Sequence, residues 1–247
     1  METILITGGT GLISTQQVRY FLDNGYRVVV TYRNDEKFKN LSSSENLYGI
    51  KIEELLDDDT SEKIICGLEK LNIFPEYLIN NACDVRWHKI EENGQVSREC
   101  MVNQYKINVI LPYELSIKLA NHSKSKLKKI INISSMYGVV PYNPSLYANP
   151  ELQTPLQYSL SKCALIHLTK ELAIRFKDKG IMVNTVSYGG VEGRVDDEFK
   201  RKFAELTPLK RMMKPEETIP AVEFLIKDSS NYMTGQNIIV DGGRTVW

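Results

Sequence analysis

The segment Thr3–Ser14, TILITGGTGLIS, decides the fold of this chain. Its β-branched start ends in a cluster of glycines, and apolar residues at helical spacing follow from Ser14 to Asn24. Gly25 then ends the predicted helix, and Arg27–Tyr32 (RVVVTY) predicts a second strand. The N-terminal part of the chain therefore predicts a strand–helix–strand unit.

The same alternation continues along the chain. Further strands are predicted at Tyr77–Asn80, Lys129–Ile133, Met182–Val186 and Asn237–Val240, and helices at Tyr105–Asn121, Gln157–Lys177, Asp196–Leu206 and Glu216–Lys227. Runs such as IINI and NIIV are continuously apolar, which is typical of parallel strands buried on both faces. We therefore expect an α/β Rossmann fold, with residues 1–247 forming one doubly wound domain whose parallel sheet carries helices on both faces.

Composition narrows the classes of function. The 247 residues carry 31 Lys and Arg against 31 Asp and Glu, so the charge signature of a nucleic-acid or acidic-membrane partner is missing. Four scattered cysteines and three histidines make a poor zinc site, and we expect no metal. We also expect no signal peptide, no membrane segment and a cytoplasmic protein with free thiols.

The glycine-rich turn after the first strand predicts a nucleotide site. Glycines let the backbone approach a pyrophosphate, and the N-terminus of the following helix supplies N–H donors. The alternative is a turn that merely connects two elements, but its position directly after a strand favours binding. The predicted cofactor contacts in this turn are Gly8, Thr10, Gly11, Leu12 and Ile13.

Motifs along almost the whole chain resemble those of the short-chain dehydrogenase/reductase family. The turn TGGTGLIS resembles the family's T-G-x-x-G-x-x-G loop, with Ser14 at the last glycine, a spacing closer to the longer epimerase-like branch. The later motifs resemble the single-domain branch. They are NNAC at Asn80–Cys83, Asn108 in YKINV, INISS at Ile131–Ser135, YSLSK at Tyr158–Lys162, VNTVSYG at Val183–Gly189, and the closing TGQ and DGG.

The resemblance implies a catalytic set of Asn108, Ser135, Tyr158 and Lys162. A tyrosine hydroxyl, with an ordinary pKa of about 10, needs help to exchange a proton near neutrality, and Lys162 lies one helical turn away. Ser135 would hold the substrate oxygen. The resemblance further implies that Lys162 binds the nicotinamide ribose and that Asn108 supports a water. Ser134 is the alternative to Ser135, because alternation along a strand lets only one of them face the site.

The end of the second predicted strand bears on the choice of cofactor. Tyr32 stands where an acidic residue would bind the ribose of NAD, and Arg33 follows it, which favours NADP with NAD as second choice. The alternative is a surface Arg33 with Asp35 on the ribose. The resemblance places adenine contacts at Asp57 and Asp58, the former favoured. The matched motifs also give Asn81, Ala82, Gly189 and Val191 as cofactor contacts.

The segment of residues 139–155 makes the spacing from Ser135 to Tyr158 longer than is usual in the family. It is rich in Tyr, Asn, Gln and Pro, residues that suit stacking on and hydrogen bonding to a sugar ring. We expect it to form a wall of the substrate pocket; the alternative is a structural or subunit-contact loop. Together with the motifs LTPL, KPEE, YMTG and VDGG between residues 206 and 243, it resembles oxidoreductases of bacterial surface-sugar and flagellin-modification pathways. That resemblance implies a sugar, sugar phosphate or sugar nucleotide as substrate.

The predicted function is therefore that of an NAD(P)-dependent oxidoreductase moving a hydride between nicotinamide and an alcohol/carbonyl pair. One alternative is a sugar-nucleotide epimerase or dehydratase, although 247 residues leave no room for the usual substrate domain. Another is a catalytically silent NADP-sensing regulator, which would be expected to have lost Tyr158 or Lys162. The family resemblance implies a small-molecule substrate and a homo-dimer or homo-tetramer.

Overall fold

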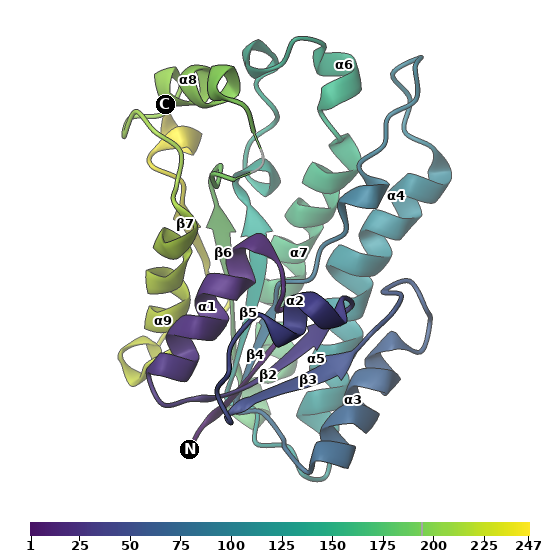
Figure 1. The fold of residues 1–247 in the computed structure, drawn as a ribbon, viewed down its shortest axis with the longest axis vertical. Coiled ribbons are helices and arrows are strands. Elements are labelled where there is room, and N and C mark those ends of the chain that lie inside the picture. The colour runs from purple at the N-terminus through teal and green to yellow at the C-terminus, as the bar shows by residue number, and fades with distance from the viewer. Residues whose placement is uncertain (194) are drawn as a thin grey trace.

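The computed structural model describes residues 1–193 and 195–247. These residues form a sheet of seven parallel strands in the order β3-β2-β1-β4-β5-β6-β7 (Figure 1). The strands are β1 (Thr3–Ile6), β2 (Arg27–Tyr32), β3 (Leu47–Lys51), β4 (Tyr77–Asn80), β5 (Lys129–Ser135), β6 (Met182–Tyr188) and β7 (Asn237–Val240). The expected doubly wound parallel sheet of a Rossmann fold is confirmed.

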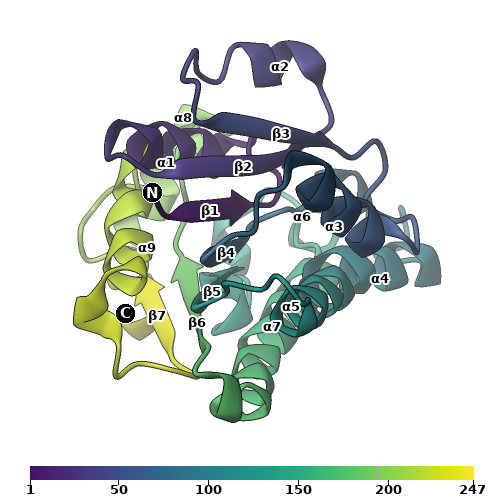
Figure 2. The ribbon, with the colours of Figure 1, turned by 90° about the horizontal axis from the view of Figure 1, so that it is seen from below.

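Helices cover both faces of this sheet (Figure 2). One face carries α1 (Leu12–Asp23) and α9 (Ile219–Ile226), and the other carries α3 (Thr60–Leu71), α5 (Leu111–Asn121) and α7 (Leu156–Arg175). Alternation along β1 explains the two cores, since Ile4 and Ile6 pack with α1 and α9 while Leu5 packs with α3, α5 and α7. Both cores consist mainly of Ile, Leu and Val.

The remaining helices lie at the ends and edges of the sheet. They are α2 (Asp35–Lys39), α4 (Arg98–Tyr105), α6 (Pro150–Gln153) and α8 (Asp197–Glu205). Figure 1 shows α6 and α8 at the same end of the molecule, beyond the carboxyl ends of β5 and β6. These two short helices therefore stand where loops of this fold meet a substrate.

Several expected elements need correction. The helix expected at Tyr105–Asn121 is α4 followed by a π-helical segment, Lys106–Ile110, and then α5. Strand β3 and helices α2 and α3 were not predicted, and β5 and β6 run two residues beyond their expected ends. The extension of β5 matters because it places Ser134 and Ser135 within the strand.

The order of the strands reverses between β1 and β4. These two strands are neighbours, and the chain continues from β1 into one half of the sheet and from β4 into the other. In open parallel sheets, ligands bind in the crevice outside the carboxyl ends of the strands at such a reversal. Thr7 and Gly8 follow β1 at this point, and Asn81 follows β4. Within the described residues, no helix has the length and apolar character needed to cross a membrane.

Candidate active site

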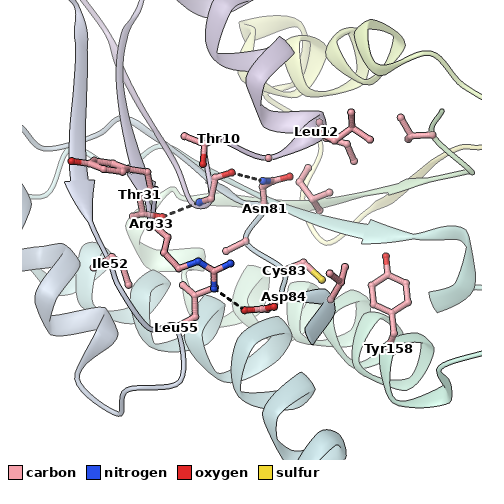
Figure 3. A pocket seen from close by; sticks show the side chains of 18 of the residues that line it. Thr10, Leu12, Thr31, Arg33, Ile52, Leu55, Asn81, Cys83, Asp84 and Tyr158 are labelled. Carbon is pink, nitrogen blue, oxygen red and sulfur yellow. Dashed lines mark hydrogen bonds and ion pairs between the residues drawn. The ribbon is translucent and has the colours of Figure 1, made fainter. Parts of the chain in front are cut away.

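A cavity of about 450 Å³ opens at the reversal of the strand order. Its size is that of a cofactor or substrate pocket. Its lining contains the following predicted cofactor contacts: Gly8, Thr10, Gly11, Leu12, Ile13, Tyr32, Arg33, Asn81, Ala82, Tyr158, Lys162, Gly189 and Val191. The structure thus brings together in one cavity residues that are spread over most of the chain (Figure 3).

The turn between β1 and α1 has the backbone of a phosphate cradle. Gly8 has a φ of +68°, and a Cβ built on Gly9 would lie 2.4 Å from the side chain of Val30. The N–H of Gly8 donates to the Thr31 hydroxyl at 2.8 Å, which fixes the turn on β2. Helical geometry leaves the first N–H groups of α1 without acceptors inside the helix, and they point toward the turn. A dinucleotide pyrophosphate fits this donor set.

Ser14 replaces the last glycine of the family's loop without disturbing it. Its buried hydroxyl donates to the Gly8 carbonyl at 2.6 Å and accepts the Gly11 N–H at 3.1 Å. The side chain therefore closes the turn from inside. The departure from the family pattern is explained by these two bonds, so the spacing of glycines here does not by itself indicate the epimerase-like branch.

The segment after β4 is tied to the glycine turn by one threonine. The Thr7 hydroxyl accepts the N–H groups of both Asn81 and Ala82, at 2.9 and 3.0 Å. The Asn81 side-chain amide donates back to the Thr7 carbonyl at 3.1 Å. These bonds hold the two rims of the crevice together at the middle of the cavity.

The end of β2 presents one cation toward the cavity and turns an acidic residue away. The Tyr32 ring stacks on Phe38 with centroids 4.2 Å apart. Asp35, the alternative ribose acceptor, pairs with Lys51 at 2.6 Å, and neither of these two residues lines the cavity. Arg33 does line it, and its Nη1 lies 3.3 Å from Oδ2 of Asp84 (Figure 3).

Asp84 is a buried carboxylate, 5% exposed, between two arginines. Burial disfavours its ionised form, but hydrogen bonds from the side chain and backbone of Arg86, with the charge of Arg33, outweigh burial, and the pKa of Asp84 is lowered. Arg86 is held in turn by Glu54 at 2.9 Å. The cavity thus has an anchored anion at the Arg33 end, which the sequence motifs did not indicate.

The two expected adenine contacts do not line this cavity. Asp57 pairs with Lys63 at 2.7 Å and Asp58 pairs with Lys106 at 2.9 Å, and neither aspartate lines the cavity. Ile52 and Leu55 line this end instead (Figure 3). The reason is local: the Ile52 N–H continues the sheet by donating to Tyr32, and the turn that follows directs the acidic run toward α3 and π-helical Lys106.

Tyr158 and Lys162 lie on one face of α7, and in Figure 3 Tyr158 stands across the cavity from Arg33. The Lys162 ammonium is 5.7 Å from the centre of the Tyr158 ring and donates to the Ile133 carbonyl at 2.7 Å. It is 4% exposed, and burial lowers the pKa of Lys162. The His88 ring lies 4.9 Å from the Tyr158 ring and also lines the cavity.

The two serines at the end of β5 differ in their hydrogen bonds. Ser134 lines the cavity, but its hydroxyl donates to the Lys162 carbonyl at 3.0 Å and so is committed to α7. Ser135 does not line the cavity, and its hydroxyl accepts the Tyr137 N–H at 3.2 Å. A hydroxyl that accepts such a bond still has its own hydrogen to donate to a substrate oxygen.

Asn108 is buried in the π-helical segment between α4 and α5, and it does not line the cavity. Its side-chain amide donates to Ser161 at 2.9 Å and to Gln104 at 2.7 Å. Among the described residues its Oδ1 has no hydrogen-bond partner. Because Ser161 directly precedes Lys162, Asn108 is tied to the helix that carries the tyrosine and lysine. Isolated π-helical turns are frequent at functional sites.

The strand β6 supplies the last part of the cavity. Tyr188, which replaces the family's proline, is buried and donates its hydroxyl hydrogen to the Thr218 carbonyl. Gly189 is required by close packing, since a Cβ there would lie 2.8 Å from the Asp241 backbone. Val191 forms a backbone bridge with Met213. Gly189 and Val191 therefore reach the cavity on a backbone held from behind by the C-terminal part of the chain.

None of residues 139–155 lines this cavity. Tyr142 stacks on Tyr137 with centroids 3.8 Å apart, and its ring meets that of Tyr147 at 6.0 Å. Tyr147 in turn packs on Phe199 of α8 at 5.6 Å. The segment is thus joined to α8 by an aromatic row that consists of Tyr137, Tyr142, Tyr147 and Phe199.

Sequence reasoning missed several residues that line the cavity. They are Thr31, Asn34, Lys37, Ile52, Leu55, Cys83, Asp84, Val85, His88 and Ile133. The only signal in the sequence was the departure at Cys83, where the family motif has glycine. The described residues contain no group of three side chains able to hold a metal.

Comparison with known proteins agrees with this geometry. A family model described as enoyl-(acyl carrier protein) reductase matches residues 12–245. A 3-oxoacyl-[acyl-carrier-protein] reductase, FabG, of Rickettsia conorii is 31% identical, with 98% of this chain and 96% of that protein covered. The chain therefore belongs to the short-chain dehydrogenase/reductase family, and it is an NAD(P)-dependent oxidoreductase of that family.

Solved structures show the same fold over the whole chain. A 4-hydroxyisoleucine dehydrogenase complexed with NADH is 25% identical, with 100% of both chains covered and a TM-score of 0.86. The structure of a 4-hydroxyisoleucine dehydrogenase with NADH and succinate has a TM-score of 0.85 at 25% identity, covering 99% of this chain and 100% of that one. Neither of these names nor that of the Rickettsia reductase refers to surface-sugar modification.

Proposed function

We propose that this protein moves a hydride between nicotinamide and an alcohol/carbonyl substrate, with Tyr158 as the group that exchanges the proton. The observation that carries the proposal is that Tyr158 and Lys162 lie in the same cavity as the glycine turn, at the end away from Arg33. A proton donor at the reacting end of a dinucleotide pocket is what carbonyl reduction requires.

The chain's own residues have distinct roles in this proposal. A bound nicotinamide cofactor supplies or accepts the hydride. Tyr158 donates a proton to the oxygen of the forming alcohol, and the nearby Lys162 ammonium favours the anion that the phenol leaves. Ser135 donates a hydrogen bond to the same oxygen, because the hydrogen of Ser134 is committed to α7. Asn108 supports a water behind Lys162.

For the cofactor itself, NADP is the first choice and NAD the second. Gly8, Thr10, Gly11, Leu12 and Ile13 would hold the pyrophosphate. Arg33 and Lys37 line the end where a 2′-phosphate would lie, whereas Asp35, the acidic ribose partner, is held by Lys51. The buried Asp84 beside Arg33 works against this preference. The similar 4-hydroxyisoleucine dehydrogenase was solved with NADH, which supports NAD as the alternative.

The substrate remains within two classes. The aromatic row of residues 139–155 supports a sugar or sugar derivative, since rings of this kind stack on sugars. The similarity to a 4-hydroxyisoleucine dehydrogenase, solved also with succinate, supports a hydroxy acid. In both classes the reacting group is an alcohol or the corresponding carbonyl.

We also infer that residues 1–247 form one domain that assembles as a homo-dimer or homo-tetramer. Exposed apolar side chains gather on α4, α5, α7 and the π-helical segment between α4 and α5. They are Val102, Ile110, Tyr113, Leu156 and Leu160. An exposed apolar surface of this kind is typical of a subunit contact. Size-exclusion chromatography with light scattering would test it; a monomer at micromolar concentration would contradict it.

The direct test of the proposed function is a screen of NADPH and NADH oxidation, with the reverse reactions, across hydroxy acids, keto acids, sugars and sugar nucleotides. The proposal expects turnover with at least one alcohol/carbonyl pair. Cofactor binding without turnover throughout the panel would favour the silent NADP-sensing regulator. Conversion of a sugar nucleotide without net change in cofactor would favour the epimerase or dehydratase.

A further inference from the structure

Arg244 is a buried cation near the C-terminus. It begins a short 3₁₀ turn, Arg244–Val246, directly after Gly243, and it is 7% exposed. Within residues 1–193 and 195–247, its side chain makes no hydrogen bond or ion pair, and its Nε is fully buried without a partner. A charged N–H that is buried without an acceptor is unfavourable. Such an arrangement in a folded protein points to a ligand that supplies the missing acceptors.

Two tyrosine hydroxyls lie within electrostatic reach of this cation. The hydroxyls of Tyr137 and Tyr147 are hydrogen-bonded to each other at 3.1 Å. Burial raises the pKa of both phenols, and the charge of Arg244 acts on both in the opposite direction. In a bond between two hydroxyls, the accepting oxygen keeps its own hydrogen for a third partner. One O–H donor therefore accompanies the guanidinium.

The same tyrosines lead back to the catalytic residues. Tyr142 stacks on Tyr137 at 3.8 Å. The Tyr137 N–H donates to the Ser135 hydroxyl at 3.2 Å, so this pair of rings lies beside the serine at the end of β5. The aromatic row thus begins beside Ser135, and the charge of Arg244 acts on its members Tyr137 and Tyr147. A substrate reacting at Tyr158 and extending along the row would place its far end at Arg244.

We propose that Arg244, with the hydroxyls of Tyr137 and Tyr147, binds a carboxylate of the substrate at the end remote from the reacting carbon. This rests on the proposed function, and it selects the acidic substrate class within it. A guanidinium offers paired N–H donors that match the two oxygens of a carboxylate. A single buried positive charge balances one negative charge, which favours a carboxylate over a phosphate dianion.

Binding can be tested without turnover. Saturation-transfer NMR on the protein with NADP⁺ would compare butyrate with its neutral isostere butyramide, and inorganic phosphate would be added as a competitor of butyrate because it carries no protons to observe. We expect butyrate to bind, butyramide and phosphate to bind at least about tenfold more weakly, and Arg244→Gln to lower butyrate affinity by about tenfold or more. Arg175→Gln, on the exposed end of α7, is the control and should bind butyrate as the wild type does.

Stability distinguishes a ligand-binding arginine from a structural one. Without ligand, Arg244→Met should raise the Tm, because it removes an unbalanced buried charge while keeping most of the side-chain volume. A structural arginine would lower the Tm when replaced. Tyr147→Phe, which removes only a hydroxyl, should weaken butyrate binding even if the Arg244 variants fail to fold.

The outcomes separate this proposal from the proposed function. Equal butyrate binding by wild type and Arg244→Gln, no butyrate binding by wild type, or a preference for phosphate would each overturn the carboxylate subsite. Tyr158→Phe should still bind butyrate. If no alcohol or carbonyl is turned over but butyrate binding depends on Arg244, the oxidoreductase proposal fails while the subsite stands.

Discussion

Nη1 of Arg33 lies 3.3 Å from Oδ2 of Asp84, and both side chains line the same end of the cavity (Figure 3). The arginine is more than half exposed, whereas the aspartate is buried and held further by Arg86. Arg33, the cation that a 2′-phosphate would need, is therefore already paired with the carboxylate of Asp84. A phosphate at this end must compete with Asp84 for Arg33, so the choice between NADP and NAD depends on both residues.

Substitutions on β2 should separate the two cofactors. Arg33→Ala should weaken NADP binding by about tenfold and leave NAD binding nearly unchanged. The reason is that the 2′-phosphate, which NAD lacks, is the part of the cofactor that Arg33 would contact. Tyr32→Asp should shift preference toward NAD by adding a ribose acceptor and repelling the phosphate. Fluorescence titration of NADPH and NADH measures both effects, with Arg175→Ala as control. An equal loss for the two cofactors would refute the phosphate-binding role of Arg33.

Asp84→Asn should raise the affinity for NADP relative to NAD severalfold. The amide keeps an oxygen to cap the Arg86 N–H, which Asp84 now accepts at 3.0 Å, but it removes the negative charge beside Arg33. The same titrations check this variant. An unchanged or lower NADP-to-NAD ratio would show that Asp84 does not oppose the phosphate.

The pH dependence of stability should show the same carboxylate. Because the pKa of Asp84 is lowered in the folded state, its ionised form stabilises the fold above the ordinary value of 3.8, and this contribution is lost as the pH falls through the lower folded value. Urea unfolding should be measured between pH 5 and pH 3, with the pH set to within about 0.2 unit. The free energy of unfolding should fall less steeply with decreasing pH for Asp84→Asn than for wild type. Asp23→Asn, an exposed change on α1, should follow the wild type. Parallel curves for all three proteins would contradict the lowered pKa.

The sequence predicted those parts of the site that depend on local motifs. The glycine turn, Asn81, Tyr158 and Lys162 each belong to a short pattern fixed to the end of a strand or to one helical face. The structure brings these patterns to one cavity because parallel strands place their carboxyl ends on the same edge of the sheet. Topology alone was enough to assemble them.

Other features depend on contacts between distant residues, which no local pattern reveals. Strand β3 was missed because Gly49 weakens its strand signal; the glycine is needed since a Cβ there would lie 2.5 and 2.6 Å from the rings of Phe38 and Tyr32. The pairing of Arg33 with Asp84 joins residues 51 positions apart. The π-helical segment was predicted as ordinary helix because its apolar pattern is continuous across the bulge.

Shortening residues 139–155 to a brief turn should raise the KM for the true substrate strongly and leave NADP affinity unchanged. The segment contacts α8 and the aromatic row, whereas the cofactor cavity is lined by other residues. Steady-state kinetics and NADPH titration provide the two measurements. Unaltered kinetics in a folded shortened protein would support the alternative of a structural or subunit-contact loop.

The most direct test of the account is the turnover of Tyr158→Phe with the first substrate found in the screen. The account predicts a loss of at least about a hundredfold in kcat, with NADPH affinity within about twofold of wild type, since only the ionisable hydroxyl is removed. Lys162→Ala should lower both, and Tyr232→Phe, a change at a fully exposed residue before β7, should leave both unchanged. A Tyr158→Phe protein that keeps most of the wild-type rate would contradict the assignment of Tyr158 as the proton donor.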